Sequence, residues 1–147
     1  KTDTFAAAPG AGTFTPITDL SLSVTTESAT EKIHLTAMLG GLGNSALNGA
    51  VHIKLRRDST DVAVGDSAGS RVRSTLSSLV VDSNISTQYN ATAVVVDAPG
   101  AAGTYTYTVH IAPGGADTVY VGLSGNDTDS PHRGRTASTL TAMRYEP

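Results

Sequence analysis

Apolar and polar residues alternate along most of this sequence with a period of two. The segment Leu20–Val24 has serine at every second position, and the segment Tyr105–Ile111 has threonine or histidine there. Successive side chains of a strand point to opposite faces, so this alternation predicts strands with one buried face, whereas a helix needs a period near 3.6. The segments expected to form strands are 20–24, 33–39, 51–55, 62–64, 72–81, 92–97, 105–111, 119–123 and 139–145.

Turn-forming residues separate these segments. Stretches rich in Gly, Pro, Asn, Asp and Ser occur at 40–49, 57–59, 65–69, 97–100, 113–115 and 125–131. Short strands divided by such turns, with no helical stripe between them, predict an all-β sandwich or barrel of about eight to ten strands.

The length of 147 residues favours one domain. Residues 1–12 differ from the rest, because small residues, Pro and Gly dominate and apolar periodicity is missing. We therefore predict an N-terminal arm over 1–12 and a single β-sandwich domain over 13–147. The arm is either a frayed terminus or a flexible segment that becomes ordered only on a partner. In the second case the partner-binding residues are Thr2, Asp3, Thr4 and Phe5.

Composition excludes several functions. The net charge of −3 opposes binding to nucleic acid through phosphate neutralisation. Apolar runs stay far shorter than the roughly 18 residues of a membrane helix, so we expect neither a nucleic acid nor a membrane as partner. Cysteine is absent, which excludes thiol catalysis and zinc–thiolate sites.

The outward faces of the expected strands carry few charges. The chain has only 3 Lys and 3 Glu, and no Lys follows residue 58. Interface cores are depleted in Lys and Glu, so another copy of the chain is expected to cover some of these faces. The alternative is a solvated sheet rich in threonine, a residue that favours strands anyway. The candidate residues for the subunit interface or the core are Tyr105, Tyr107, His110, Met143 and Tyr145.

One motif suggests catalysis. Gly65–Gly69 fits the G-x-S-x-G pattern of a serine nucleophile, but a nucleophile elbow needs a helix after the serine. The residues that follow Gly69 are strand-like, and a tight loop explains the glycines equally well. We expect no catalytic residues, no cofactor and no enzymatic activity.

Metal binding has weak support in the sequence. His34, His52 and His110 each lie in the middle of an expected strand, and their spacing does not bring them together. Asn126–Ser130 gathers oxygen atoms that suit calcium, but the later Gly and Glu of an EF-hand are missing. We predict no metal site. Two interpretations of Asp127 and Asp129 stay open: they bind a calcium ion, or they belong to a turn whose side chains hydrogen-bond its own backbone.

Three stretches resemble structural β-domains of tailed-bacteriophage virions, of the head decoration (cement) or fibre-tip type. They are GTFTPITDLSLSVTTESATEKIHLTAML at 12–39, VHIKLRRDSTDVAVGDSAGSR at 51–71 and RTASTLTAMRYEP at 135–147. The resemblance implies a jelly-roll-like antiparallel sandwich, similar to the C1q and tumour-necrosis-factor domains, that forms a homotrimer with its late strands near the axis. The chain departs from the family after Met143, where Arg144 is expected to cap the strand or to pair with an Asp.

The resemblance implies a non-enzymatic virion protein. The expected function is capsid decoration, in which a trimer binds the major capsid protein on the outer surface of the head and stabilises the shell. The alternative is the receptor-binding tip of a tail fibre or head fibre, which would contact a host-surface receptor through the loops 40–49 and 125–134.

Overall fold

The protein is an all-β sandwich. The computed structural model describes residues 3–46, 49–79 and 87–147, and these contain no helix, so no helix in this part of the chain is long and apolar enough to cross a membrane. The strands are β1 (Phe5–Ala7), β2 (Thr15–Thr26), β3 (Lys32–Asn44), β4 (Ala50–Arg57), β5 (Thr60–Val62), β6 (Leu76–Leu79), β7 (Tyr89–Asp97), β8 (Gly103–Pro113), β9 (Val119–Val121) and β10 (Thr139–Tyr145).

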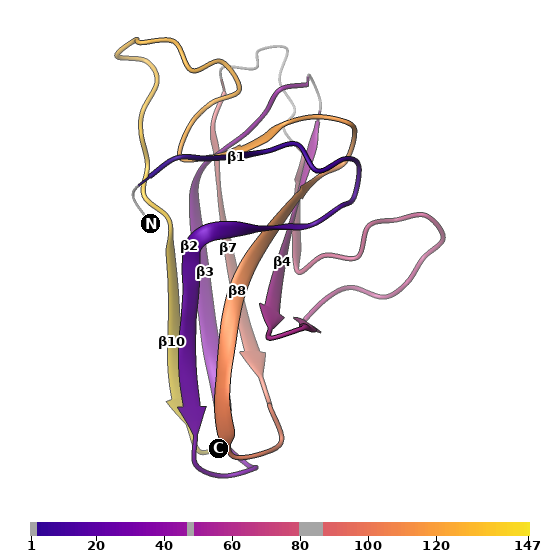
Figure 1. The fold of residues 1–147 in the computed structure, drawn as a ribbon, viewed down its shortest axis with the longest axis vertical. Coiled ribbons are helices and arrows are strands. Elements are labelled where there is room, and N and C mark those ends of the chain that lie inside the picture. The colour runs from indigo at the N-terminus through magenta and orange to yellow at the C-terminus, as the bar shows by residue number, and fades with distance from the viewer. Residues whose placement is uncertain (1–2, 47–48, 80–86) are drawn as a thin grey trace.

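The strands form two antiparallel sheets (Figure 1). In the first sheet, β3 pairs with β7, β10 and β9, and β1 pairs with β9. In the second sheet, β8 lies between β2 and β4, and both β5 and β6 pair with β4. The pairs β1–β9, β2–β8, β3–β7 and β4–β5 are nested in the chain, as in a long hairpin that is rolled into two sheets. This nesting is the topology of a jelly roll, so the predicted fold class is confirmed.

The alternation of the sequence decides which side chains fill the space between the sheets. On β3 the buried residues Ile33, Leu35 and Leu39 face this space, and on β4 Ile53 and Leu55 do the same. The alternate residues on β3, His34, Thr36 and Met38, point outward and are less buried. The core is therefore built from one face of each strand.

A buried polar contact connects the two sheets. Asp97, the last residue of β7, accepts hydrogen bonds from Arg57 Nη1 at 2.6 Å and from the Tyr107 hydroxyl at 2.7 Å, and both partners belong to the other sheet. Burial and the adjacent Asp97 carboxylate raise the pKa of Tyr107, which keeps the phenol protonated. Burial opposes the charge of Arg57, but the contact with Asp97 outweighs it and raises the pKa of Arg57.

The predicted arm needs a correction. Phe5–Ala7 forms β1, which pairs with Val119–Val121 of the same chain, and the half-buried Phe5 packs against the core. These residues are therefore ordered without a partner. Their main-chain groups complete the ladder of β9, a contribution that hydropathy does not reveal. Asp3 and Thr4 are exposed and precede the strand, whereas Thr2 lies outside the described residues.

Two predicted boundaries also change. A turn was expected from residue 40, but β3 continues to Asn44 through an irregularity in its pairing with β7. Gly41 permits this, because it adopts a φ of +59° and a Cβ atom there would lie 2.5 Å from Thr136 Oγ1. The strand expected over 72–81 is shorter in the described part, where β6 covers Leu76–Leu79, and residues 80 and 81 lie outside the described residues.

We expect Tyr107→Ala to lower the free energy of unfolding by roughly 3 kcal/mol, because it leaves a cavity in the core. Tyr107→Phe keeps the ring and removes only the hydrogen bond to Asp97, so its expected cost is about 1 to 2 kcal/mol. Urea unfolding of both variants measures the two effects. Equal unfolding midpoints for both variants and the wild type would contradict the described burial of Tyr107.

Candidate functional site

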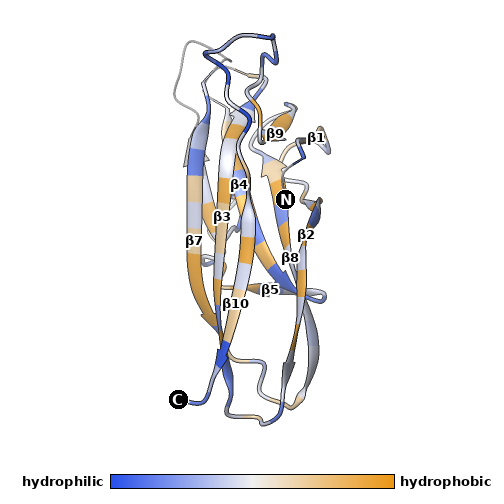
Figure 2. Cartoon of the chain, turned by 90° about the vertical axis from the view of Figure 1, so that its left-hand side faces the viewer, coloured by the Kyte–Doolittle hydropathy of each residue, from blue (hydrophilic) through white to orange (hydrophobic). Residues whose placement is uncertain are grey.

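The outer face of the sheet formed by β10, β3 and β7 is nearly free of charge. Figure 2 looks onto the side of the molecule on which β7, β3 and β10 run side by side. We call the outward side chains of these strands the β10–β3–β7 face. It consists of His34, Thr36, Met38, Thr92, Val94, Val96, Thr139, Thr141, Met143 and Tyr145. These residues include no Asp, Glu, Lys or Arg, and the face has one charged side chain, that of Lys32, the first residue of β3, which lies opposite Tyr145.

Large apolar side chains are exposed on this face. Met143 is 62% exposed, Val94 58% and Val96 50%, and Met38 and Tyr145 are also exposed. Every large hydrophobic residue that is exposed in the described part of the chain lies here. Single exposed apolar residues are ordinary, but their concentration on one face indicates a contact surface.

The strand register makes the face continuous. Met143 lies opposite His34, which lies opposite Val96. The next row along the sheet consists of Thr141, Thr36 and Val94, and the row after that of Thr139, Met38 and Thr92. Residues opposite each other on neighbouring strands have Cβ atoms about 4.5–5.5 Å apart, so the apolar groups adjoin threonine methyl groups without a charged gap.

A small cavity of about 280 Å³ lies at the Met38 end of this face. Its lining residues are Met38, Leu39, Gly40, Asn90, Thr92, Thr136 and Ala137. The buried Thr136 Oγ1 has no hydrogen-bond partner among the described residues. The cavity is therefore a recess at one end of this sheet face.

The structure places the five predicted interface or core residues at three locations. Met143 and Tyr145 lie on the β10–β3–β7 face. Tyr107 is completely buried in the core, and Tyr105 packs against the edge of the core and donates its hydroxyl to the Ala101 carbonyl at 3.0 Å. His110 is buried on the outer side of the second sheet, opposite Lys54 on β4.

Sequence reasoning missed three members of the face, Met38, Val94 and Val96. Met38 alternates with core residues in the same way as His34 and Thr36, and this signal could have placed it outward. The run of three valines at 94–96 has no polar residue in it, so its sequence does not say which valines face the core. The register with β3 places Val95 inward and its two neighbours outward.

Positive groups surround His110. Burial lowers its pKa first, and the charges of Arg56 and Lys54 lower it further, while Asp61 acts in the opposite direction. Asp61 in turn accepts contacts from Lys54 Nζ at 2.9 Å and Arg56 Nε at 2.7 Å. Burial opposes the charge of Asp61, but these two hydrogen bonds outweigh it and lower the Asp61 pKa. Lys54, Arg56 and Asp61 therefore form an ion-pair network in which the Asp61 carboxylate is shared by two cations.

The motifs that suggested chemistry lie apart from one another. Gly65–Gly69 is in the exposed loop between β5 and β6, and the next element is a strand, which does not fit a nucleophile elbow.

The proposed calcium loop carries arginines. Asp127 pairs with Arg135 at 2.7 Å. Asp129 and Arg133 together line a second cavity of about 280 Å³, separate from the one at Met38. Two arginines at this position make it a poor cation site. Within the described ranges, no three His, Asp or Glu residues gather as metal ligands.

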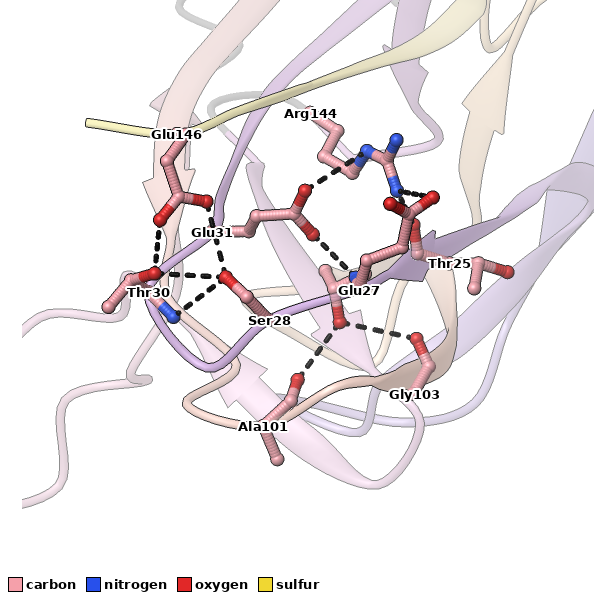
Figure 3. Close-up of polar contacts among 10 residues, drawn as sticks. Thr25, Glu27, Ser28, Thr30, Glu31, Ala101, Gly103, Arg144 and Glu146 are labelled. Carbon is pink, nitrogen blue, oxygen red and sulfur yellow. Dashed lines mark hydrogen bonds and ion pairs between the residues drawn. The ribbon is translucent and has the colours of Figure 1, made fainter.

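Arg144 has carboxylate partners, but they are glutamates and not the expected Asp. Its guanidinium lies 3.0 Å from Glu27 Oε1 and 3.4 Å from Glu31 Oε1, and it also donates to the Thr25 carbonyl at 3.1 Å (Figure 3). Glu146 accepts hydrogen bonds from the Ser28 and Thr30 hydroxyls. These contacts fasten the end of β10 to the turn between β2 and β3.

We expect the stability of the protein to fall as the pH drops below about 6.5, because a histidine with a lowered pKa in the fold is protonated more easily in the unfolded chain. His110 and His52 both act in this direction. His110→Gln removes one of them, so the decrease between about pH 7 and pH 5 becomes smaller. Chemical denaturation at both pH values measures it. His132→Gln, an exposed control, leaves the decrease unchanged. An identical decrease in His110→Gln and the wild type would contradict the described environment of His110.

The chain matches no protein-family model, and no relative is found among the curated proteins. The residues quoted above therefore remain the basis for the resemblance to virion proteins. The β10–β3–β7 face is the feature of the described structure that bears most directly on function.

Proposed function

We propose that this protein is a non-enzymatic structural protein of a phage virion. In this proposal a homotrimer binds the major capsid protein on the outer surface of the head and stabilises the shell as a decoration protein. The observation that carries the self-association is the β10–β3–β7 face, where all the exposed large hydrophobic residues of the described chain lie together. The position on a virion rests on the sequence resemblance.

The physical argument for self-association is the cost of leaving this face in water. Covering one exposed Met or Val side chain contributes on the order of 1 to 2 kcal/mol. Lys32, at one end, is the single charged side chain of the face, so covering the remaining residues buries no unpaired charge, which is the usual penalty for covering a surface. A Thr-rich solvated sheet alone would not gather Met38, Val94, Val96 and Met143 on one side.

A trimer fits the position of β10 in this sheet. β10 pairs with β3 on one side and presents Met143 and Tyr145 outward near one end. Three copies that turn these strands toward a common axis cover the apolar side chains and leave the second sheet exposed. The three-fold symmetry then matches the local three-fold positions of a capsid shell, where one trimer contacts several capsid subunits through equivalent surfaces.

The fibre tip is the second candidate, and it predicts the same trimer. Its support is the long connection from Gly122 to Ser138 between β9 and β10, which lies at the end of the sandwich away from Glu146 (Figure 1). Surface loops of this length often carry binding residues. The two functions differ in what the trimer binds, so one experiment separates them.

We expect Met143→Lys to convert the trimer into monomers, because three lysines would meet near the axis. The fold remains stable, since Met143 is exposed. Light scattering gives the mass, and thermal melting checks the fold. Ser21→Lys, at an exposed position on the second sheet, is the matched control and retains the wild-type mass. A wild-type protein that is monomeric at micromolar concentration would overturn the self-association.

The wild-type trimer is then mixed with heads and, separately, with host cells of a phage whose virion contains it. Co-sedimentation with heads, together with greater resistance of these heads to heat, supports decoration. Binding to cells without binding to heads overturns decoration in favour of the fibre tip.

A further inference from the structure

β7 forms one edge of its sheet. β7 pairs with β3 along one side from Ala91 to Asp97, and no described strand pairs with its other side. Figure 2 shows β7 as the outer margin of its sheet. Among the described residues, no side chain hydrogen-bonds to the main chain of residues 91–96. Alternate N–H and C=O groups of an edge strand point away from the sheet and can pair with another strand.

Proteins usually protect such edges, and the other long edge strands here are protected. β2 contains Pro16 and a break in its register, with Asp19 at a φ of 62°, and these features bend it and place a charge on it. β10 carries Arg144, which reaches across to the Thr25 carbonyl of β2. β7 has none of these features between Asn90 and Val96, a stretch without Pro, Gly, Lys, Arg, Asp or Glu.

The composition of this stretch fits a second copy of itself. Asn90–Val96 has no charge, so antiparallel self-pairing places no like charges opposite each other. It also contains three valines and a threonine, residue types that favour strands. A two-fold axis makes the contact self-complementary, because each main-chain N–H on the outer edge of one copy meets a C=O on the outer edge of the other.

We propose that β7 pairs antiparallel with β7 of a second copy about a two-fold axis at Ala93, which joins two sheets into one continuous sheet. In this register Val94 lies opposite Thr92 of the other copy, and Val96 lies opposite Asn90. The outward side chains of both copies extend the β10–β3–β7 face across the contact, and the inward residues Ala91 and Ala93 are small and already buried. This contact uses a strand edge and does not rest on the proposed trimer or on a place in a virion.

Disulfide cross-linking tests the pairing, and the absence of native cysteine makes the result simple to read. Thr92→Cys and Val94→Cys are prepared separately, mixed and oxidised under mild conditions. Both positions are exposed, so the fold tolerates them. In the proposed register the two cysteines face each other within the Cα separation that a disulfide needs. We expect the mixed dimer to form on the order of a hundredfold faster than a collision product, since paired thiols experience a millimolar effective concentration.

The matched control is the pair Ser21→Cys and Ser23→Cys, which has the same spacing and exposure on the protected edge of β2. Cross-linking at β7 no faster than at β2 overturns the proposal. The mixture is also tested in the Met143→Lys background. Rapid cross-linking that persists there supports an edge contact independent of the trimer, whereas cross-linking that disappears with the trimer assigns it to the β10–β3–β7 face and overturns the proposal.

A charge on the edge gives a second readout. Val94→Lys is introduced into both members of an Asn90→Cys and Val96→Cys mixture, whose cysteines lie opposite each other in the proposed register. We expect it to abolish their cross-linking, and to lower the solution mass where the wild type shows two smaller assemblies joined together. The wild type is also measured at 100 micromolar, on the order of the dissociation constant of a weak contact. If it then shows no species larger than the assembly formed without β7 pairing, β7 does not self-pair. If β7 instead binds an extended strand of another protein and does not cross-link to itself, the proposal that a second copy pairs with β7 is overturned.

Discussion

Each strand of this sandwich can hide only one of its two faces, and the rest of the structure follows from that limit. β3 illustrates it, because Ile33 and Leu35 fill the core while His34 and Thr36 are left outside. The same limit applies to β7 and β10. On their outer sides the chain has threonine and apolar residues where a solvated sheet normally has lysine and glutamate. The core and the proposed contact surface are thus two sides of the same strands.

Two of the ion-pair contacts connect the two sheets. Asp97 joins the ends of two sheets through Arg57 and Tyr107, and Arg144 fastens β10 to the turn after β2. Only the first of these contacts is largely buried, and its carboxylate is satisfied by two donors. Breaking it leaves a charge without a partner inside the protein, which costs more than losing an exposed pair. Neither of these two contacts lies on the face that we propose to be covered, where Lys32 is the one charged side chain.

Much of the fold could be predicted from the sequence, because a period of two is unambiguous wherever polar and apolar residues alternate. The segments around Leu22, Ile53 and Tyr107 gave β2, β4 and β8. The prediction failed where a residue acts through its main chain. Phe5–Ala7 looks like a linker, yet its backbone completes β9, and Gly41 looks like a turn, yet its left-handed conformation lets β3 continue. For the candidate site, alternation placed Met143 and Tyr145 correctly on one strand. It could not join them with Met38 and Val96, because only the register between distant strands brings these residues together.

The nested pairing of the strands also determines when the chain can finish folding. Residues 32–38 of β3 pair with residues 139–145 of β10, which are synthesised roughly a hundred residues later. This side of β3 therefore stays unpaired until β10 has been made. During synthesis the long, apolar edge of β3 has no native partner until residue 145 has left the ribosome. A strand in that condition is open to pairing with the wrong chain. The interval before β10 is made is therefore a stage at which this chain is exposed to mispairing, whatever the stability of the folded sandwich.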